Sequence, residues 1–170
     1  MKDIKNASPL AFAHSFRLTD APDAVVAQAR HCLLDLLGVA IGGSQTKLAR
    51  IICAHAAEDF AGSAPLMFAE GTASPPGIAL AGGMMIDALD GHDGYNPAKG
   101  HIGCALLPAI LALAPEHCSG TAFLEALIIG YELGSRLGPA LHGTVSDYHT
   151  SGAWMAVATA VVGARLCGLD

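Results

Sequence analysis

Apolar residues recur at three- and four-residue steps along almost the whole 170-residue chain, which is the spacing of one face of an α-helix. Ser8 before Pro9 is typical of a helix start, and Gly42 and Gly43 are typical of a helix end. We therefore expect an all-α fold, a helical bundle of about seven or eight helices. The pattern predicts helices over roughly 8–16, 22–43, 46–60, 75–89, 104–114, 121–141 and 151–166.

Two features interrupt this helical pattern. Residues 64–74 have no helical period, so we expect an extended connector with at most one short strand and no clear strand pair. The predicted helix over 75–89 contains Gly77, Gly82 and Gly83. Because each glycine costs a helix about 1 kcal/mol relative to alanine, we expect another backbone or a ligand close to this helix.

The composition predicts a covered surface. The chain is 52% hydrophobic and only 14% charged, whereas soluble domains average about 25% charged residues. Aromatic residues make up 5%, so the core must consist mainly of Ala, Leu, Ile and Val. The low charge indicates that another subunit or domain covers some apolar surface, and a homodimer is the simplest expectation.

Charge and patterning argue against several classes of function. The net charge is −6 and there is no run of Lys or Arg, so we expect no nucleic-acid partner. Gly, His or charged residues interrupt every apolar stretch before the roughly 20 residues of a membrane span, so we expect no membrane partner. The first ten residues lack the apolar segment of a signal peptide, which predicts a cytoplasmic protein. Five widely spaced cysteines predict reduced thiols.

Residues 87–103, the first polar loop, contain three Asp, two His, one Lys and four Gly. Asp90 and Asp93 would share a face if the preceding helix continued for one more turn. Paired carboxylates raise one of the two pKa values and so provide a general acid or base, and His101 is a second candidate proton carrier. His92 and Lys99 are candidates for substrate binding. A solvated loop with helix-capping Asp residues is the alternative.

A metal site is a further reading of the first polar loop, because Asp and His are common ligands. The sequence contains no established metal-binding motif, however, and we predict no metal.

Residues 142–149, the second polar loop, lie directly before a predicted helix. His149 precedes Thr150 and Ser151 at the start of that helix. The first turn of a helix presents free N–H groups and the positive end of the helix dipole, which bind carboxylates. We predict that Thr150 and Ser151 bind an anionic substrate and that His149 donates to it or carries a proton. An ordinary capping region with an incidental histidine is the alternative.

With both loops in view, the chain resembles the MmgE/PrpD family over nearly all of its length. The segments that carry the resemblance are "ARHCLLDLLGVAIGGSQT" (29–46), "IDALDGHDGYNPAKGHIGCALLPAILALA" (86–114), "YELGSRLGPAL" (131–141) and "YHTSGAWMAVATAVVGARLCGL" (148–169). The resemblance implies catalytic roles for Asp90, Asp93, His101 and His149.

Three positions depart from the family pattern in the first polar loop. Asp87 stands where the family has His, His92 replaces an Asp, and Ile102 replaces a Pro. These departures leave the reaction open among the chemistries of the family.

The resemblance implies that residues 1–170 form a single helical domain, the N-terminal part of a longer two-domain protein. It implies a cofactor-independent lyase, similar to 2-methylcitrate dehydratase, that moves a proton at a carbon next to a carboxylate of a small di- or tricarboxylate. An isomerase similar to iminodisuccinate epimerase, or an enzyme similar to cis-aconitate decarboxylase, is an alternative. A non-catalytic helical dimerisation fragment is the alternative from another class.

Overall fold

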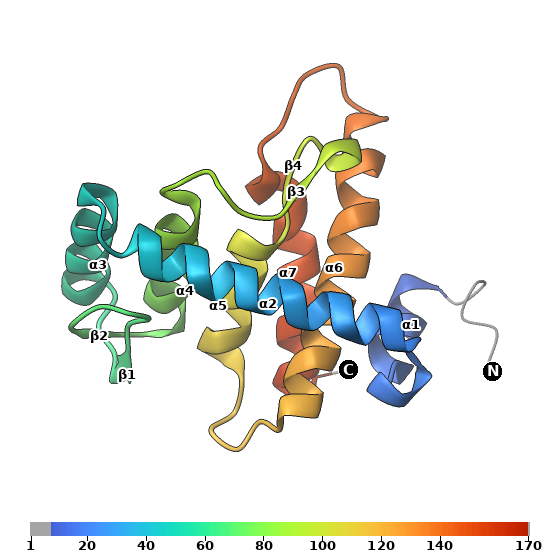
Figure 1. The fold of residues 1–170 in the computed structure, drawn as a ribbon, viewed down its shortest axis with the longest axis horizontal. Helices are drawn as coiled ribbons and strands as arrows, with labels where there is room; N and C mark the ends of the chain where they lie inside the picture. The colour runs from blue at the N-terminus through green and yellow to red at the C-terminus, as the bar shows by residue number, and fades with distance from the viewer. Residues whose placement is uncertain (1–7, 170) are drawn as a thin grey trace.

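The computed structural model describes residues 8–169, and the described chain is predominantly α-helical (Figure 1). This confirms the predicted all-α fold and the lower end of the predicted helix number. The seven α-helices are α1 (Pro9–Ser15), α2 (Asp23–Gly43), α3 (Lys47–Asp59), α4 (Pro75–Asp87), α5 (Gly103–Leu113), α6 (Gly120–His142) and α7 (Ser151–Leu166). Two short 3-10 helices, η2 (Leu18–Asp20) and η3 (Asn96–Ala98), lie in the connections.

The expectation of no strand pair is wrong, because two antiparallel pairs of two-residue strands occur. In the first pair, β1 (Ala64–Pro65) lies beside β2 (Thr72–Ala73). In the second, β3 (Gly94–Tyr95) pairs with β4 (Gly100–His101), with Gly94 opposite His101. Strands of two residues are too short to show the alternation of apolar and polar residues by which a strand is recognised in sequence. The second pair folds the first polar loop into a hairpin.

The glycines of α4 allow close packing against neighbouring elements. A Cβ atom on Gly82 would lie 2.7 Å from the Cβ of Pro108 in α5. A Cβ atom on Gly77 would lie 2.6 Å from the Cβ of Phe60 at the end of α3. At Gly77 and Gly82 the close neighbours are side chains, whereas we expected another backbone or a ligand. A backbone atom comes close at Gly83, where an added Cβ would lie 3.3 Å from the carbonyl oxygen of Cys104 in α5. This contact sets the position of the C-terminus of α4, where the first polar loop begins.

The core consists of two clusters of buried side chains with α5 contributing to both. One cluster joins α1, α5, α6 and α7 with Ala29 of α2, and the other joins α2, α3, α4 and α5. Leu106 and Leu107, neighbours on α5, point into different clusters and are both fully buried. α2 runs across one side of the helices that form these clusters (Figure 1). The first polar loop therefore starts and ends on two helices that the core holds firmly.

α2 keeps much of its apolar surface uncovered. Leu34 is 70% exposed and Ile41 is 53% exposed. Among the described helices α2 is long and apolar enough to cross a membrane by length and composition alone, and 17% of its apolar stretch is buried. This finding fits the predicted covered surface, while the expectations of a homodimer and of no membrane partner stay predictions. Most of the segment on which the signal-peptide prediction rests lies outside the described residues.

Candidate active site

The two polar loops lie together at one end of the domain, where the β3–β4 hairpin approaches the connection between α6 and α7 (Figure 1). The backbone N–H of His101 donates to Oγ of Ser151 over 2.8 Å. The hydroxyl of Tyr148 donates to the carbonyl oxygen of Lys99 over 3.2 Å. Two segments about fifty residues apart in sequence are therefore joined by direct hydrogen bonds.

A cavity of about 1240 Å³ opens between α4, the hairpin, α5 and the start of α7. Its wall is partly apolar, with Ala79, Leu80 and Met155 among its residues. Five of the eight side chains predicted for catalysis or binding line this cavity: Asp90, Lys99, His101, Thr150 and Ser151. A concave, partly apolar cavity with a few converging polar groups is the usual form of a ligand site.

Asp90 and His101 form the titratable pair of this cavity. Oδ1 of Asp90 lies 3.5 Å from Nε2 of His101. The Asp90 side chain is 86% exposed, whereas that of His101 is 27% exposed. At 3.5 Å the pair is longer than a normal hydrogen bond, but catalytic hydrogen bonds are often long before substrate binds. The pair can accept or donate a proton at the edge of the cavity.

The premise that Asp90 and Asp93 share a helix face is wrong. α4 ends at Asp87, and the N–H of Asp90 donates to the carbonyl oxygen of Asp87 in a turn. Asp90 has φ of +45°, in the left-handed region, which no continued right-handed helix allows. The two carboxylates consequently point to different partners.

Asp93 holds the start of α5 and does not line the cavity. Its Oδ2 accepts a hydrogen bond from the N–H of Gly103 over 2.9 Å, and its Oδ1 lies 3.3 Å from Nδ1 of His92. The free N–H groups of a first helical turn need such acceptors. Asp93 also lines a separate groove of about 730 Å³ between α2 and α6, beside Tyr131. For Asp93 the geometry favours the capping alternative.

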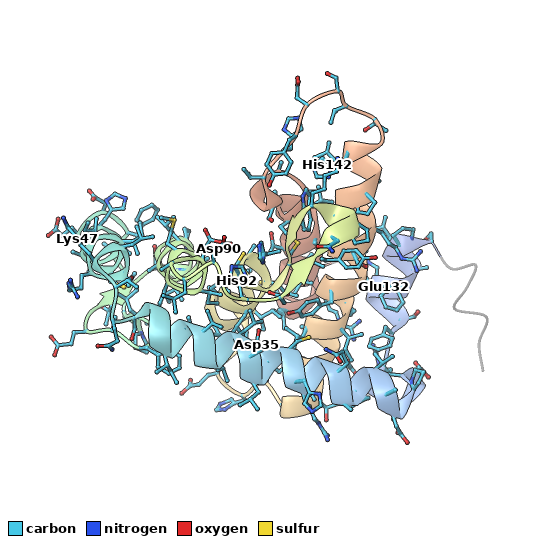
Figure 2. All side chains as sticks on the ribbon, turned by 45° about the horizontal axis from the view of Figure 1, so that its top comes forward. Asp35, Lys47, Asp90, His92, Glu132 and His142 are labelled. Carbon is cyan, nitrogen blue, oxygen red and sulfur yellow. The ribbon has the colours of Figure 1, made fainter. Side chains whose placement is uncertain are left out.

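His92 is buried beneath the cavity with its side chain fully covered. Nε2 lies 3.2 Å from Oδ1 of Asp87, and the ring centroid lies 4.1 Å from that of His101. Figure 2 shows His92 and Asp90 near each other in the loop that follows α4. Burial lowers the pKa of His92, but the hydrogen bonds and negative charges of Asp93 and Asp87 outweigh burial and raise it above its ordinary value. Asp87 and His92, two of the three departures from the family pattern, therefore contact each other.

His149 lies beside the cavity, but its side chain does not line it in the described chain. The loop is held here through backbone atoms, because Nε2 of His142 lies 3.1 Å from the carbonyl oxygen of His149. The ring of His142 also stacks on Tyr148, with centroids 5.7 Å apart. His149 itself is exposed, next to Thr150, which does line the cavity.

Two groups of side chains in the described part of the chain are close enough to share a metal ion. They are Asp87 with His92 and Cys104, and Asp90 with His92 and His101. Both groups need a nitrogen of His92, and both of its nitrogens already face carboxylates. Burial, followed by the charges of Asp87 and Asp93, raises the pKa of the Cys104 thiol to about 12, so this thiol is a poor ligand until a cation displaces its proton. The prediction of no metal stays a prediction.

The residue patterns missed two side chains that shape this site. Tyr148 joins the two loops through Lys99, and Cys104 lines the cavity from α5. The position of Tyr148 next to His149 in a polar loop was the available signal for its role. Cys104 gave no such signal, because a single cysteine in an apolar helix looks like any small core residue.

The fold and site define a helical domain with a carboxylate–imidazole cavity, and comparison with known proteins identifies its family. The sequence profile of the MmgE/PrpD N-terminal domain matches residues 10–170. The chain belongs to the MmgE/PrpD family. It is also 29% identical over 165 residues to the cis-aconitate decarboxylase-like protein oryM of Aspergillus oryzae. That match covers 89% of this chain but 34% of the relative, so the chain spans about a third of the length of this curated relative.

Proposed function

We propose that this chain supplies the acid–base half of the active site of a cofactor-independent lyase, similar to 2-methylcitrate dehydratase. The proposed substrate is a small di- or tricarboxylate that loses a proton at a carbon next to a carboxylate. The single observation that carries the proposal is the Asp90–His101 pair at the edge of a cavity that the start of α7 also lines. Family membership supports an enzymatic role.

The pair supports a proton-transfer step. His101 or Asp90 accepts the proton from carbon, and the other group returns a proton to the leaving hydroxyl or to carbon. Removing the proton places negative charge on the neighbouring carboxylate, so cationic or N–H donors must face it. Lys99 and the first turn of α7, at Thr150 and Ser151, line the same cavity and meet that need.

His149 is proposed to join this site from the second polar loop. Its exposed side chain adjoins Thr150, which lines the cavity. The cavity is larger than the roughly 300–1,000 Å³ typical of small-molecule pockets. Its size supports a substrate site that further residues complete.

Decarboxylation is the second candidate, supported by the similarity to a protein described as cis-aconitate decarboxylase-like. Both reactions use a positioned proton donor and acceptor and differ in whether water or carbon dioxide leaves. Epimerisation needs the same pair and no leaving group. A non-catalytic dimerisation domain is the alternative outside enzymes.

The test is an assay of the full-length protein with 2-methylcitrate, cis-aconitate and iminodisuccinate, run in D2O and followed by proton NMR. A dehydratase forms the alkene from 2-methylcitrate and exchanges deuterium into the substrate carbon. Release of carbon dioxide from cis-aconitate would assign the second candidate instead. No turnover and no deuterium exchange with any of the three would count against an enzyme of this kind.

We also propose that the protein is a homodimer, with α2 as part of the covered surface. The exposure of Leu34 and Ile41 supports this. Light scattering on the full-length protein should give twice the chain mass, and Leu34→Glu should shift it towards the monomer. A monomeric wild-type protein at micromolar concentration would contradict this proposal.

A further inference from the structure

His92 is the one side chain of the first polar loop that is fully covered and yet faces two acids. Its Nε2 lies 3.2 Å from Oδ1 of Asp87, and its Nδ1 lies 3.3 Å from Oδ1 of Asp93. Asp87 is 60% exposed and Asp93 is 14% exposed. The 3.2 Å contact is at the upper end of the usual N–H···O hydrogen-bond range, and the 3.3 Å contact is just beyond it. The ring therefore bridges the last residue of α4 and the acid that holds the first turn of α5.

The two contacts place a constraint on the protonation state of this ring. A neutral imidazole has one N–H donor and one lone pair, whereas the protonated ring has two N–H donors. Ionised carboxylates only accept hydrogen bonds. In neutral His92 one nitrogen lone pair would face a carboxylate oxygen at 3.2–3.3 Å inside a covered site. Only the imidazolium satisfies both acids.

We propose that His92 is held as an imidazolium between Asp87 and Asp93 throughout turnover and that it acts as a positioning residue for the ring of His101. The two ring centroids are 4.1 Å apart, with 46° between the ring planes. Because His92 cannot turn without breaking a contact to an acid, it presents a fixed surface to His101. His92 does not line the cavity.

The surroundings of His92 favour this charge. The ionisable side chains near it are Asp87 at the end of α4, Asp90 and Asp93 in the loop, His101 on β4 and Cys104 on α5. Three of these five are acids. Burial lowers the pKa of His92, and the two bonded acids more than reverse that effect. The pKa of the Cys104 thiol is raised to about 12, so that thiol keeps its proton.

His101 is held quite differently, and the difference assigns the two rings separate tasks. Its Nε2 faces a single acid, Asp90, at 3.5 Å, and its Nδ1 has no hydrogen-bond partner among the described residues. A ring with one loose contact can gain and lose a proton during turnover. A ring bonded at both nitrogens holds its charge. His101 thus moves protons and His92 keeps it in place.

The protonation state is tested by NMR on the full-length protein labelled with 15N in its histidine rings, with His92→Gln assigning the signals. Both His92 nitrogens should carry protons at pH 8, well above the ordinary histidine pKa of about 6.5. One unprotonated ring nitrogen at pH 8 would overturn the proposal. A shift of these signals on addition of Zn²⁺ at equimolar concentration would overturn it in favour of a metal ligand.

The positioning role rests on the proposed function and is tested by turnover against pH. His92→Gln should lower turnover roughly tenfold, the lower end of what losing an orienting partner costs at metal sites, with little change in KM. Asp87→Asn should lower the pH at which turnover declines on the alkaline side of the profile. Asp87→Glu should return that pH towards the wild-type value. A loss of turnover that is the same at every pH would contradict the positioning role.

A matched control is His55→Gln, because His55 pairs with Asp59 over 2.7 Å on the exposed side of α3. It should leave turnover and its pH profile unchanged. The two proposals fail separately. If no substrate turns over, the proposed function fails. The NMR signals of the His92 ring still decide whether it is charged. The His101 signals in His92→Gln still report whether the His101 ring moves.

Discussion

The two polar loops meet at one cavity but are built in different ways. In the first loop, side chains bond to one another and to helix ends, as His92 does with Asp87 and Asp93. In the second loop, side chains bond instead to backbone carbonyl oxygens, as His142 does to that of His149 and Tyr148 does to that of Lys99. The first loop is anchored between α4 and α5, whereas the second is largely exposed.

The first loop therefore has a fixed geometry, whereas the second loop can adjust its position. Proton transfer needs donor and acceptor held at hydrogen-bond distance, so it suits the anchored loop. A substrate carboxylate can instead be met by exposed groups that close after binding. We therefore expect changes in the first loop to affect both stability and chemistry, and changes in the second loop to affect turnover while leaving the fold intact.

The largest effect is expected from His101→Ala in the full-length protein. Losing a positioned proton carrier should lower turnover by about 10²- to 10⁴-fold. Steady-state kinetics measures this, and circular dichroism checks that helicity is kept. The control is His14→Ala on the exposed surface of α1, which should change neither. Near-normal turnover of His101→Ala would remove the basis for the acid–base pair.

His149→Ala tests the second loop in the same way. A hydrogen bond to a charged group contributes about 1.5–3 kcal/mol, so losing one to a substrate carboxylate should lower kcat/KM roughly ten- to a hundredfold. The melting temperature should stay unchanged, because the contacts described for His149 are made by its backbone. A drop in melting temperature together with normal turnover would reverse the comparison between the loops.

Much of this architecture follows from the sequence. The period of apolar residues predicted all seven helices, and the glycines of α4 predicted a close neighbour, found at Pro108. The sequence also singled out five residues that line the cavity, because the polar loops gather ionisable side chains within an apolar chain; they are Asp90, Lys99, His101, Thr150 and Ser151.

The direction in which each acid of the first loop points could not be predicted. Asp90 and Asp93 are equivalent by residue type and spacing, yet one faces the cavity and the other caps α5. The left-handed backbone at Asp90 and the two-residue hairpin decide this, and neither leaves a periodic signal. The contact between Asp87 and His92 is likewise set by the way the loop folds back.

The third expected effect is a pH dependence of stability that arises in the first loop. The pKa of His92 is raised in the folded protein, so its bonds to Asp87 and Asp93 stabilise the fold fully below the unfolded pKa. That contribution is lost as pH rises through the higher folded pKa. The free energy of unfolding should fall over this range by on the order of 1 kcal/mol, the net contribution of a typical hydrogen bond. Urea titrations of wild type and His92→Gln measure it, and their difference should shrink as pH rises.

The smallest effect is expected where the second loop depends on the first. The Tyr148 hydroxyl donates to the carbonyl oxygen of Lys99 over 3.2 Å, at an exposed position. Tyr148→Phe removes this bond but keeps the ring that stacks on His142. An exposed hydrogen bond of about 0.5–1 kcal/mol corresponds to roughly a two- to fivefold change. We expect this change in KM and not in kcat, because the bond positions the loop that we propose binds substrate and leaves the Asp90–His101 pair untouched. A loss in kcat of more than tenfold would mean that the second loop also sets the geometry of proton transfer, and the division between the loops would then fail.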